Sequence, residues 1–265
     1  MKQKSIYSKV AQDMFFIKLK WSLWFLSFIL LAYIVLIVIS VNLGNTFGDF
    51  SAFSYGSSRI YMLVIGTLSA YYFLPFYIHQ GLTRKDYFIG TALSSFGISI
   101  AIAVFASILT GIEYVTLKLF SLSHVLNSSM ENSLIENANK NISIDLTGMM
   151  FGGSKFIDVG SNLAVTLLTY SISIFIFYLI GWLIGVGYYR FGWIVGFGFI
   201  LISLLFIACT EFLLGSELGE PLTTLLPFAP TTIPVFATIV GMFVLIVFIL
   251  WIIRLITRSI TIKMF

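Results

Sequence analysis

Long apolar runs separated by short polar segments dominate the chain. Six runs contain no Asp, Glu, Lys or Arg: Trp21–Gly48, Ile60–Thr83, Tyr87–Ile112, Val159–Tyr189, Phe191–Thr210 and Pro221–Ile253. A helix needs about 20 apolar residues to cross a hydrocarbon core of about 30 Å, so each run suffices for one crossing. The strict alternation that is typical of a membrane β-barrel strand is absent from these runs. The pattern predicts an all-α, polytopic membrane protein with six transmembrane helices, at about residues 21–43, 60–79, 88–112, 160–187, 192–211 and 233–254.

Residues 1–20, before the first predicted span, have a different pattern. Apolar side chains recur there at helical spacing, at Ile6, Val10, Met14 and Ile17, and polar residues occupy the opposite side. This pattern predicts an N-terminal interfacial amphipathic helix, anchored by lysines, ahead of a single transmembrane domain over residues 21–265. The alternative is a solvated basic segment that leads directly into the first span.

Prolines and polar clusters predict where the spans are interrupted. Pro75 lies near the end of the second span, where it removes a backbone donor and should kink the helix. The other four prolines fall between Pro221 and Pro234, which predicts a broken external segment over residues 211–232. Residues 113–158 are rich in Asn and Ser and are expected to form a long external loop.

Charge is scarce and unevenly distributed. The chain is 59% hydrophobic and 10% charged, whereas a soluble domain carries about 25% charged residues. The six predicted spans place the 15 basic residues on two sides of the membrane in unequal numbers. One side has Lys2, Lys4, Lys9, Lys18, Lys20, Arg84, Lys85, Arg190, Arg254, Arg258 and Lys263. The positive-inside rule makes that side, with both termini, cytoplasmic. The net charge of +4 then requires no nucleic-acid partner.

Two glycine pairs flank the predicted turn between the fourth and fifth spans. Gly181 and Gly185 precede this turn, and Gly192 and Gly196 follow it. Each pair forms a G-x-x-x-G pattern, which lets transmembrane helices approach closely. We therefore expect all four to be helix-packing residues; a sliding surface is the more specialised alternative.

The chain offers no constellation for catalysis or for cofactor or metal binding. No lysine is preceded by glycine, which excludes a G-x-x-x-x-G-K phosphate loop, and Cys209 is the one cysteine. The two histidines, His79 and His124, are expected on opposite sides of the membrane. No charged residue falls in the middle of a predicted span, which disfavours proton-coupled transport. The sequence thus predicts a non-enzyme, and any uphill transport must draw its energy from another polypeptide.

A polar segment after the second span carries a family resemblance. The stretch "GLTRKDYF" at residues 81–88 resembles the "G-[VL]-T-R-K-x-[FY]-F" pattern of the membrane subunits of type-2 ABC permeases, in their Gram-positive branch. The stretch "YYRFG" at residues 188–192 is similar to that branch's "Y-[YR]-x-F-G" turn. The six-span layout, with a large loop after the third span, fits the same family.

The resemblance implies a coupling hairpin over residues 79–88 that docks on a separate ABC ATPase, where ATP and magnesium would bind. Its coupling residues would be Gly81, Leu82, Thr83, Arg84, Lys85, Asp86, Tyr87 and Phe88. We expect Thr83 to N-cap a short helix, with Asp86 at its third position. A solvated, positively charged turn is the alternative for this segment.

The same resemblance implies a location in the cell membrane of a Gram-positive bacterium, and pairing with a second permease copy or a paralogue. A pathway without mid-membrane charge favours export of an amphipathic peptide or a lipid-like or antimicrobial compound, as in the phenol-soluble modulin exporters. The substrate-binding residues are unknown from the sequence. The alternative function is a non-transporting membrane sensor or assembly component whose external loop binds a ligand.

Overall fold

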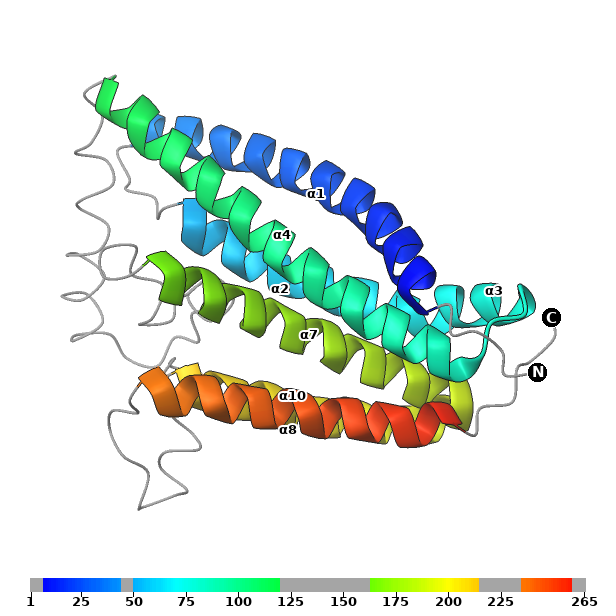
Figure 1. The fold of residues 1–265 in the computed structure, drawn as a ribbon. Coiled ribbons are helices and arrows are strands. Elements are labelled where there is room, and N and C mark those ends of the chain that lie inside the picture. The colour runs from blue at the N-terminus through cyan, green and yellow to red at the C-terminus, as the bar shows by residue number, and fades with distance from the viewer. Residues whose placement is uncertain (1–6, 44–49, 120–162, 215–234, 259–265) are drawn as a thin grey trace, which may run out of the picture.

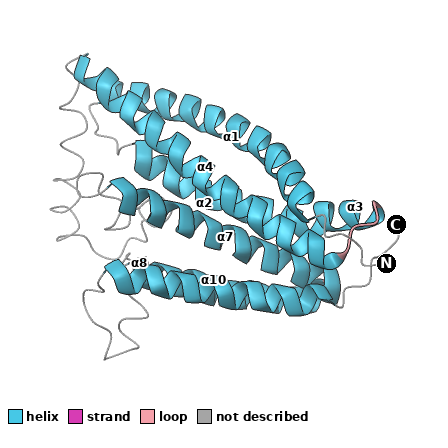
Figure 2. Ribbon diagram, viewed as in Figure 1, coloured by secondary structure: helices cyan, strands magenta, loops and turns pink. Residues whose placement is uncertain are grey.

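A computed structural model describes residues 7–43, 50–119, 163–214 and 235–258. This part of the chain is helical, with no strand (Figures 1 and 2). Its elements are α1 (Tyr7–Leu43), α2 (Phe50–Leu68), the π-helical turn η1 (Ser69–Phe73), α3 (Leu74–His79), α4 (Arg84–Leu119), α7 (Leu163–Phe191), α8 (Trp193–Leu214) and α10 (Val235–Arg258).

Among the described residues, six helical segments are long and apolar enough to cross a membrane, which confirms the predicted class of an all-α protein with six candidate spans. The segments are Tyr7–Ile39, Phe53–His79, Arg84–Glu113, Ala164–Phe191, Trp193–Leu214 and Phe236–Arg258. Glu113 lies inside α4 and Glu211 inside α8, so the first residues of both predicted external segments are helical. The rest of these segments, to residues 158 and 232, lies almost entirely outside the described residues.

The helix α7 is the centre of the bundle. In its most apolar stretch 78% of the residues are buried, against 22% in α1 and in α8. The helices α1, α2 and α4 lie on one side of α7, and α8 and α10 lie on the other (Figure 1). The outer faces of α1, α8 and α10 expose large apolar side chains, as expected of surfaces that face lipid or a second subunit.

The first helix shows no boundary at residue 20. It continues from Tyr7 to Leu43 and curves along its length (Figure 1). The separate interfacial helix predicted for residues 1–20 is therefore not seen, and residues 1–6 lie outside the described part. Val10, Met14 and Lys18 are all buried, because a continuous α1 turns this face toward the bundle.

Near Pro75, where the sequence predicts a kink, the helix type changes. The π-helical turn Ser69–Phe73 directly precedes α3, with Pro75 in the first positions of α3. Proline has no backbone N–H, and its ring clashes with the carbonyl four residues earlier, so regular α-helical bonding cannot continue there. The carbonyl of Ser69 accepts from the Leu74 N–H and also from the Tyr87 hydroxyl, which ties this turn to α4.

Glycines bring α2 and α7 into backbone contact. A Cβ atom at Gly181 would overlap the carbonyl oxygen of Leu63, and one at Gly66 would lie 2.8 Å from the Trp182 nitrogen. At Gly185 a Cβ would lie 2.8 Å from the Thr67 carbonyl oxygen. The partner of this G-x-x-x-G face is thus α2, although α8 follows α7 in the chain.

The second glycine pair has two separate roles. Gly192 has a φ of +82° with no atom near its missing Cβ, so it serves the turn between α7 and α8. A Cβ at Gly196 would lie 2.6 Å from the Tyr188 ring, so this glycine makes room for a side chain of α7. Both glycines help α8 to fold back beside α7.

One end of the bundle gathers the beginnings of α1 and α4, the turn between α7 and α8, and the end of α10 (Figure 1). We call this the basic end, because Lys9, Arg84, Lys85, Arg190 and Arg258 belong to these segments. Its assignment to the cytoplasm stays a prediction from the positive-inside rule.

Candidate functional site

The hairpin at residues 79–88 is a fixed turn at the basic end (Figure 2). The Gly81 N–H donates to the Ile78 carbonyl at 2.9 Å, and the Leu82 N–H donates to the Tyr77 carbonyl at 3.2 Å. These two bonds form a Schellman motif that closes α3. The motif requires a left-handed residue, and Gly81, with a φ of +84°, provides it without steric cost.

The start of α4 is capped by Thr83, which confirms the predicted N-cap. The Asp86 N–H donates to the Thr83 hydroxyl oxygen at 3.1 Å, and the Thr83 hydroxyl donates to the Asp86 carboxylate at 2.8 Å. Asp86 also places a negative charge in the first turn, where it complements the helix dipole. The expected short helix is not a separate element, since α4 continues from Arg84 into the third span.

Only part of the predicted coupling set is accessible to a partner. Gly81, Thr83 and Lys85 are exposed, as are His79 and Gln80 directly before them. Leu82, Arg84, Asp86 and Phe88 are half-buried, and Tyr87 is fully buried. Tyr87 therefore holds the turn from inside, through its bond to Ser69, and the exposed residues form its outer surface.

Two arginines join the turns of the basic end to the last turn of α10. The guanidinium of Arg84 donates to the Arg258 carbonyl at 3.0 Å, and that of Arg190 donates to the Ile256 carbonyl at 3.0 Å. Basic groups suit a helix C-terminus because they satisfy its free carbonyls and its dipole. Arg254 of α10 also lies over the Phe88 ring, at 5.3 Å from the ring centroid. The hairpin and α10 are thus in direct contact.

Removal of the Thr83 cap should loosen the hairpin. We expect Thr83→Ala to destabilise the start of α4 by about 1 kcal/mol, because the Asp86 N–H loses its acceptor. Hydrogen exchange at the amides of residues 84–87 would measure the local opening. Thr83→Ser keeps the hydroxyl and should exchange like the wild type. Equal protection in the alanine and serine variants would contradict the capping role.

Sequence reasoning missed a buried lysine. Lys18 is 1% exposed. Its ammonium group donates to the hydroxyl oxygens of Ser95 at 2.7 Å, Tyr178 at 3.2 Å and Ser94 at 3.3 Å. The hydroxyl of Tyr178 continues the network to Ser69 at 2.7 Å. Within the described part of the chain Lys18 makes no ion pair.

A buried ion pair lies toward the opposite end of the bundle. Arg59 of α2 pairs with Glu211 of α8, and both are almost fully buried. The Arg59 guanidinium also lies 4.3 Å from the centroid of the Phe177 ring and 4.7 Å from that of the Tyr55 ring. The sequence placed both charges at span ends. The helices extend beyond those limits, so the interior does contain charge.

Breaking this pair should be costly. We expect Arg59→Met to destabilise the fold by about 3–5 kcal/mol, because it removes the counter-ion of the buried Glu211. The double variant Arg59→Met/Glu211→Leu should recover much of that loss. Thermal unfolding in a mild detergent would compare them. A double variant no more stable than Arg59→Met would show that the pair does not act as a unit.

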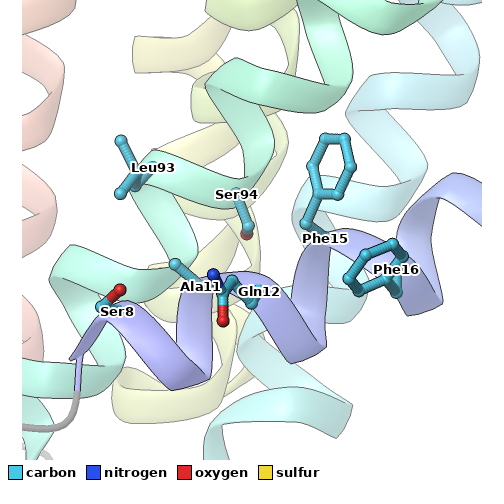
Figure 3. Close-up of a pocket in the computed structure, with 7 residues that line it drawn as sticks. All are labelled: Ser8, Ala11, Gln12, Phe15, Phe16, Leu93 and Ser94. Atoms are coloured by element: carbon cyan, nitrogen blue, oxygen red, sulfur yellow. The ribbon is translucent and has the colours of Figure 1, made fainter.

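A groove of about 340 Å³ lies between α1 and α4 (Figure 3). Its lining residues are Ser8, Ala11, Gln12, Phe15, Phe16, Leu93 and Ser94. Ser94 points from α4 toward α1 (Figure 3), and its hydroxyl is one of the acceptors of Lys18. The groove therefore adjoins the buried lysine.

The described residues contain no group of three or more His, Cys, Asp or Glu side chains that could hold a metal ion. Comparison of the chain with family models, with curated proteins and with solved structures found no match. The functional interpretation therefore rests on the hairpin, on the buried charges and on the resemblance of residues 81–88 to the permease pattern.

Proposed function

We propose that this chain is the membrane-spanning permease subunit of an ATP-driven ABC exporter. A separate ATPase subunit, which binds ATP and magnesium, docks on the exposed residues of the hairpin at the basic end. The observation that carries the proposal is the double capping of this hairpin: a Schellman motif closes α3, and Thr83 opens α4. A turn fixed on both sides transmits a push instead of absorbing it.

The contacts of α10 extend this mechanism. Arg84 connects the hairpin to the Arg258 carbonyl, and Arg190 connects the α7–α8 turn to the same helix end. A force on the hairpin thus reaches α4 directly and α10 through Arg84. Because α10 lies on the other side of α7 from α4, both sides of the bundle respond together.

The proposed cargo is an amphipathic peptide or a lipid-like or antimicrobial compound. Two properties support it: the scarcity of charge in the spans, and the resemblance at residues 81–88. The buried charges are engaged, Arg59 with Glu211 and Lys18 with hydroxyl groups. A chain of this size supplies half of a pathway, so a second copy or a paralogue completes it in the cell membrane.

The experiment that tests the proposal is affinity purification of the tagged protein in a mild detergent, with bound proteins identified and assayed for ATP hydrolysis. An ABC ATPase in near-equal amount is the expected result. Recovery of the protein without an ATPase would overturn the proposal. It would favour the alternative of a sensor or assembly component with a ligand-binding loop over residues 113–158.

A further inference from the structure

The groove between α1 and α4 changes in polarity along its length. Both helices begin at the basic end, so Ser8 and Gln12 lie nearest to it (Figure 1). Phe15 and Phe16 follow on α1, and Leu93 faces the groove from α4 (Figure 3). The groove lies within two candidate spans, Tyr7–Ile39 and Arg84–Glu113. In a bilayer whose headgroups surround the basic end, its polar part would lie at the headgroup level and its apolar part at the level of the acyl chains.

The charge beside this groove is unbalanced among the described residues. Lys18 is buried against Ser94, Ser95 and Tyr178, which are all neutral. The nearest carboxylate along α1, Asp13, accepts from the Tyr77 hydroxyl at 2.6 Å. A buried ammonium without a counter-ion is costly, and an anion in the groove would reduce that cost.

We propose that the groove is a binding site for a phospholipid with an anionic headgroup. The headgroup phosphate lies near Gln12 and Ser94, within the field of the Lys18 ammonium. One acyl chain follows Phe15, Phe16 and Leu93. Basic pockets between transmembrane helices at the cytoplasmic level suit such headgroups. The site does not depend on the proposed export function.

Ser94 connects the ligand to the lysine. Its hydroxyl donates to the Thr91 carbonyl at 3.0 Å and accepts from Lys18 at 3.3 Å. A hydroxyl has one donor and two acceptor positions, so it can turn its hydrogen from Thr91 to a phosphate oxygen while it still accepts from Lys18. The lysine therefore stabilises a bound anion without leaving its buried position.

Native mass spectrometry of the purified full chain, titrated with phosphatidylglycerol or with phosphatidylcholine of identical acyl chains, tests the site. We expect phosphatidylglycerol to bind roughly tenfold more tightly. Lys18→Met should abolish this preference, because it removes the charge while Ser94, Ser95 and Tyr178 keep other partners. Equal binding of the two lipids by the wild type would overturn the proposal.

The matched control is Lys20→Met, which removes an equal charge from an exposed position of the same helix. It should retain the preference for phosphatidylglycerol. A second variant, Gln12→Trp, fills the groove from an exposed position and should weaken phosphatidylglycerol binding even if Lys18→Met fails to fold. The proposal would be overturned if Lys20→Met lost the preference for phosphatidylglycerol as fully as Lys18→Met. Unchanged phosphatidylglycerol binding by Gln12→Trp would also overturn it.

Discussion

Gly181→Ala is expected to destabilise the protein by about 3 kcal/mol or more. The added methyl group would overlap the Leu63 carbonyl oxygen and lie 2.8 Å from the Leu63 carbonyl carbon. Both atoms belong to the backbone of α2, which cannot rotate away as a flexible side chain can. The turn η1 directly follows α2 and also contacts α7. Because α7 is the central helix, a displaced α2 therefore also weakens the contacts between α7 and η1. Thermal unfolding in a mild detergent should show a transition lower by about 6 °C or more.

Gly198→Ala is the matched control, since it adds the same methyl group to α8 where no atom lies within 4 Å. It should leave the unfolding temperature unchanged or raise it, because alanine favours a helix over glycine by about 1 kcal/mol. Gly66→Ala approaches the same contact from α2 and should be as destabilising as Gly181→Ala. Equal unfolding temperatures for the variants at residues 181 and 198 would contradict the close approach of α2 and α7.

The six spans could be predicted from the sequence because length and charge-free composition are local properties of a membrane helix. The glycine pattern was also visible, but it indicates only that a helix surface is flat. It does not specify which helix packs there. The sequence named no partner for Gly181, and the structure places α2 against it. Such a choice depends on contacts between segments that are distant in the sequence.

Lys18 shows why the buried charges escaped prediction. Lys18 and Lys20 look alike as basic residues before the first span, but two positions turn a helix by about 200° and so separate their faces. A signal was present: Val10, Met14, Lys18, Ser22 and Leu26 recur at intervals of four, and all are buried. Lys18 therefore lies on the stripe that faces the bundle. The assumption of a helix boundary at residue 20 concealed that stripe.

Lys85→Glu is expected to weaken association with the proposed ATPase roughly tenfold or more, because it reverses an exposed charge on the proposed docking surface. The change should not disturb the fold. Residue 85 occupies the second position of α4, where a carboxylate complements the helix dipole. Co-purification of the two subunits, at equal expression in the membrane, measures the effect. Thr116→Glu places a new charge at the exposed far end of the same helix and should co-purify normally.

The structure makes Lys85 a sharper test than the neighbouring Arg84. Arg84→Glu would also break the bond to the Arg258 carbonyl, so a loss of association could arise from a displaced α10. Lys85 has no hydrogen-bond or ion-pair partner among the described residues. A loss in Lys85→Glu alone would therefore locate the contact on the hairpin surface. Wild-type co-purification by Lys85→Glu would mean that the hairpin is not the docking site, even if an ATPase binds elsewhere on the basic end.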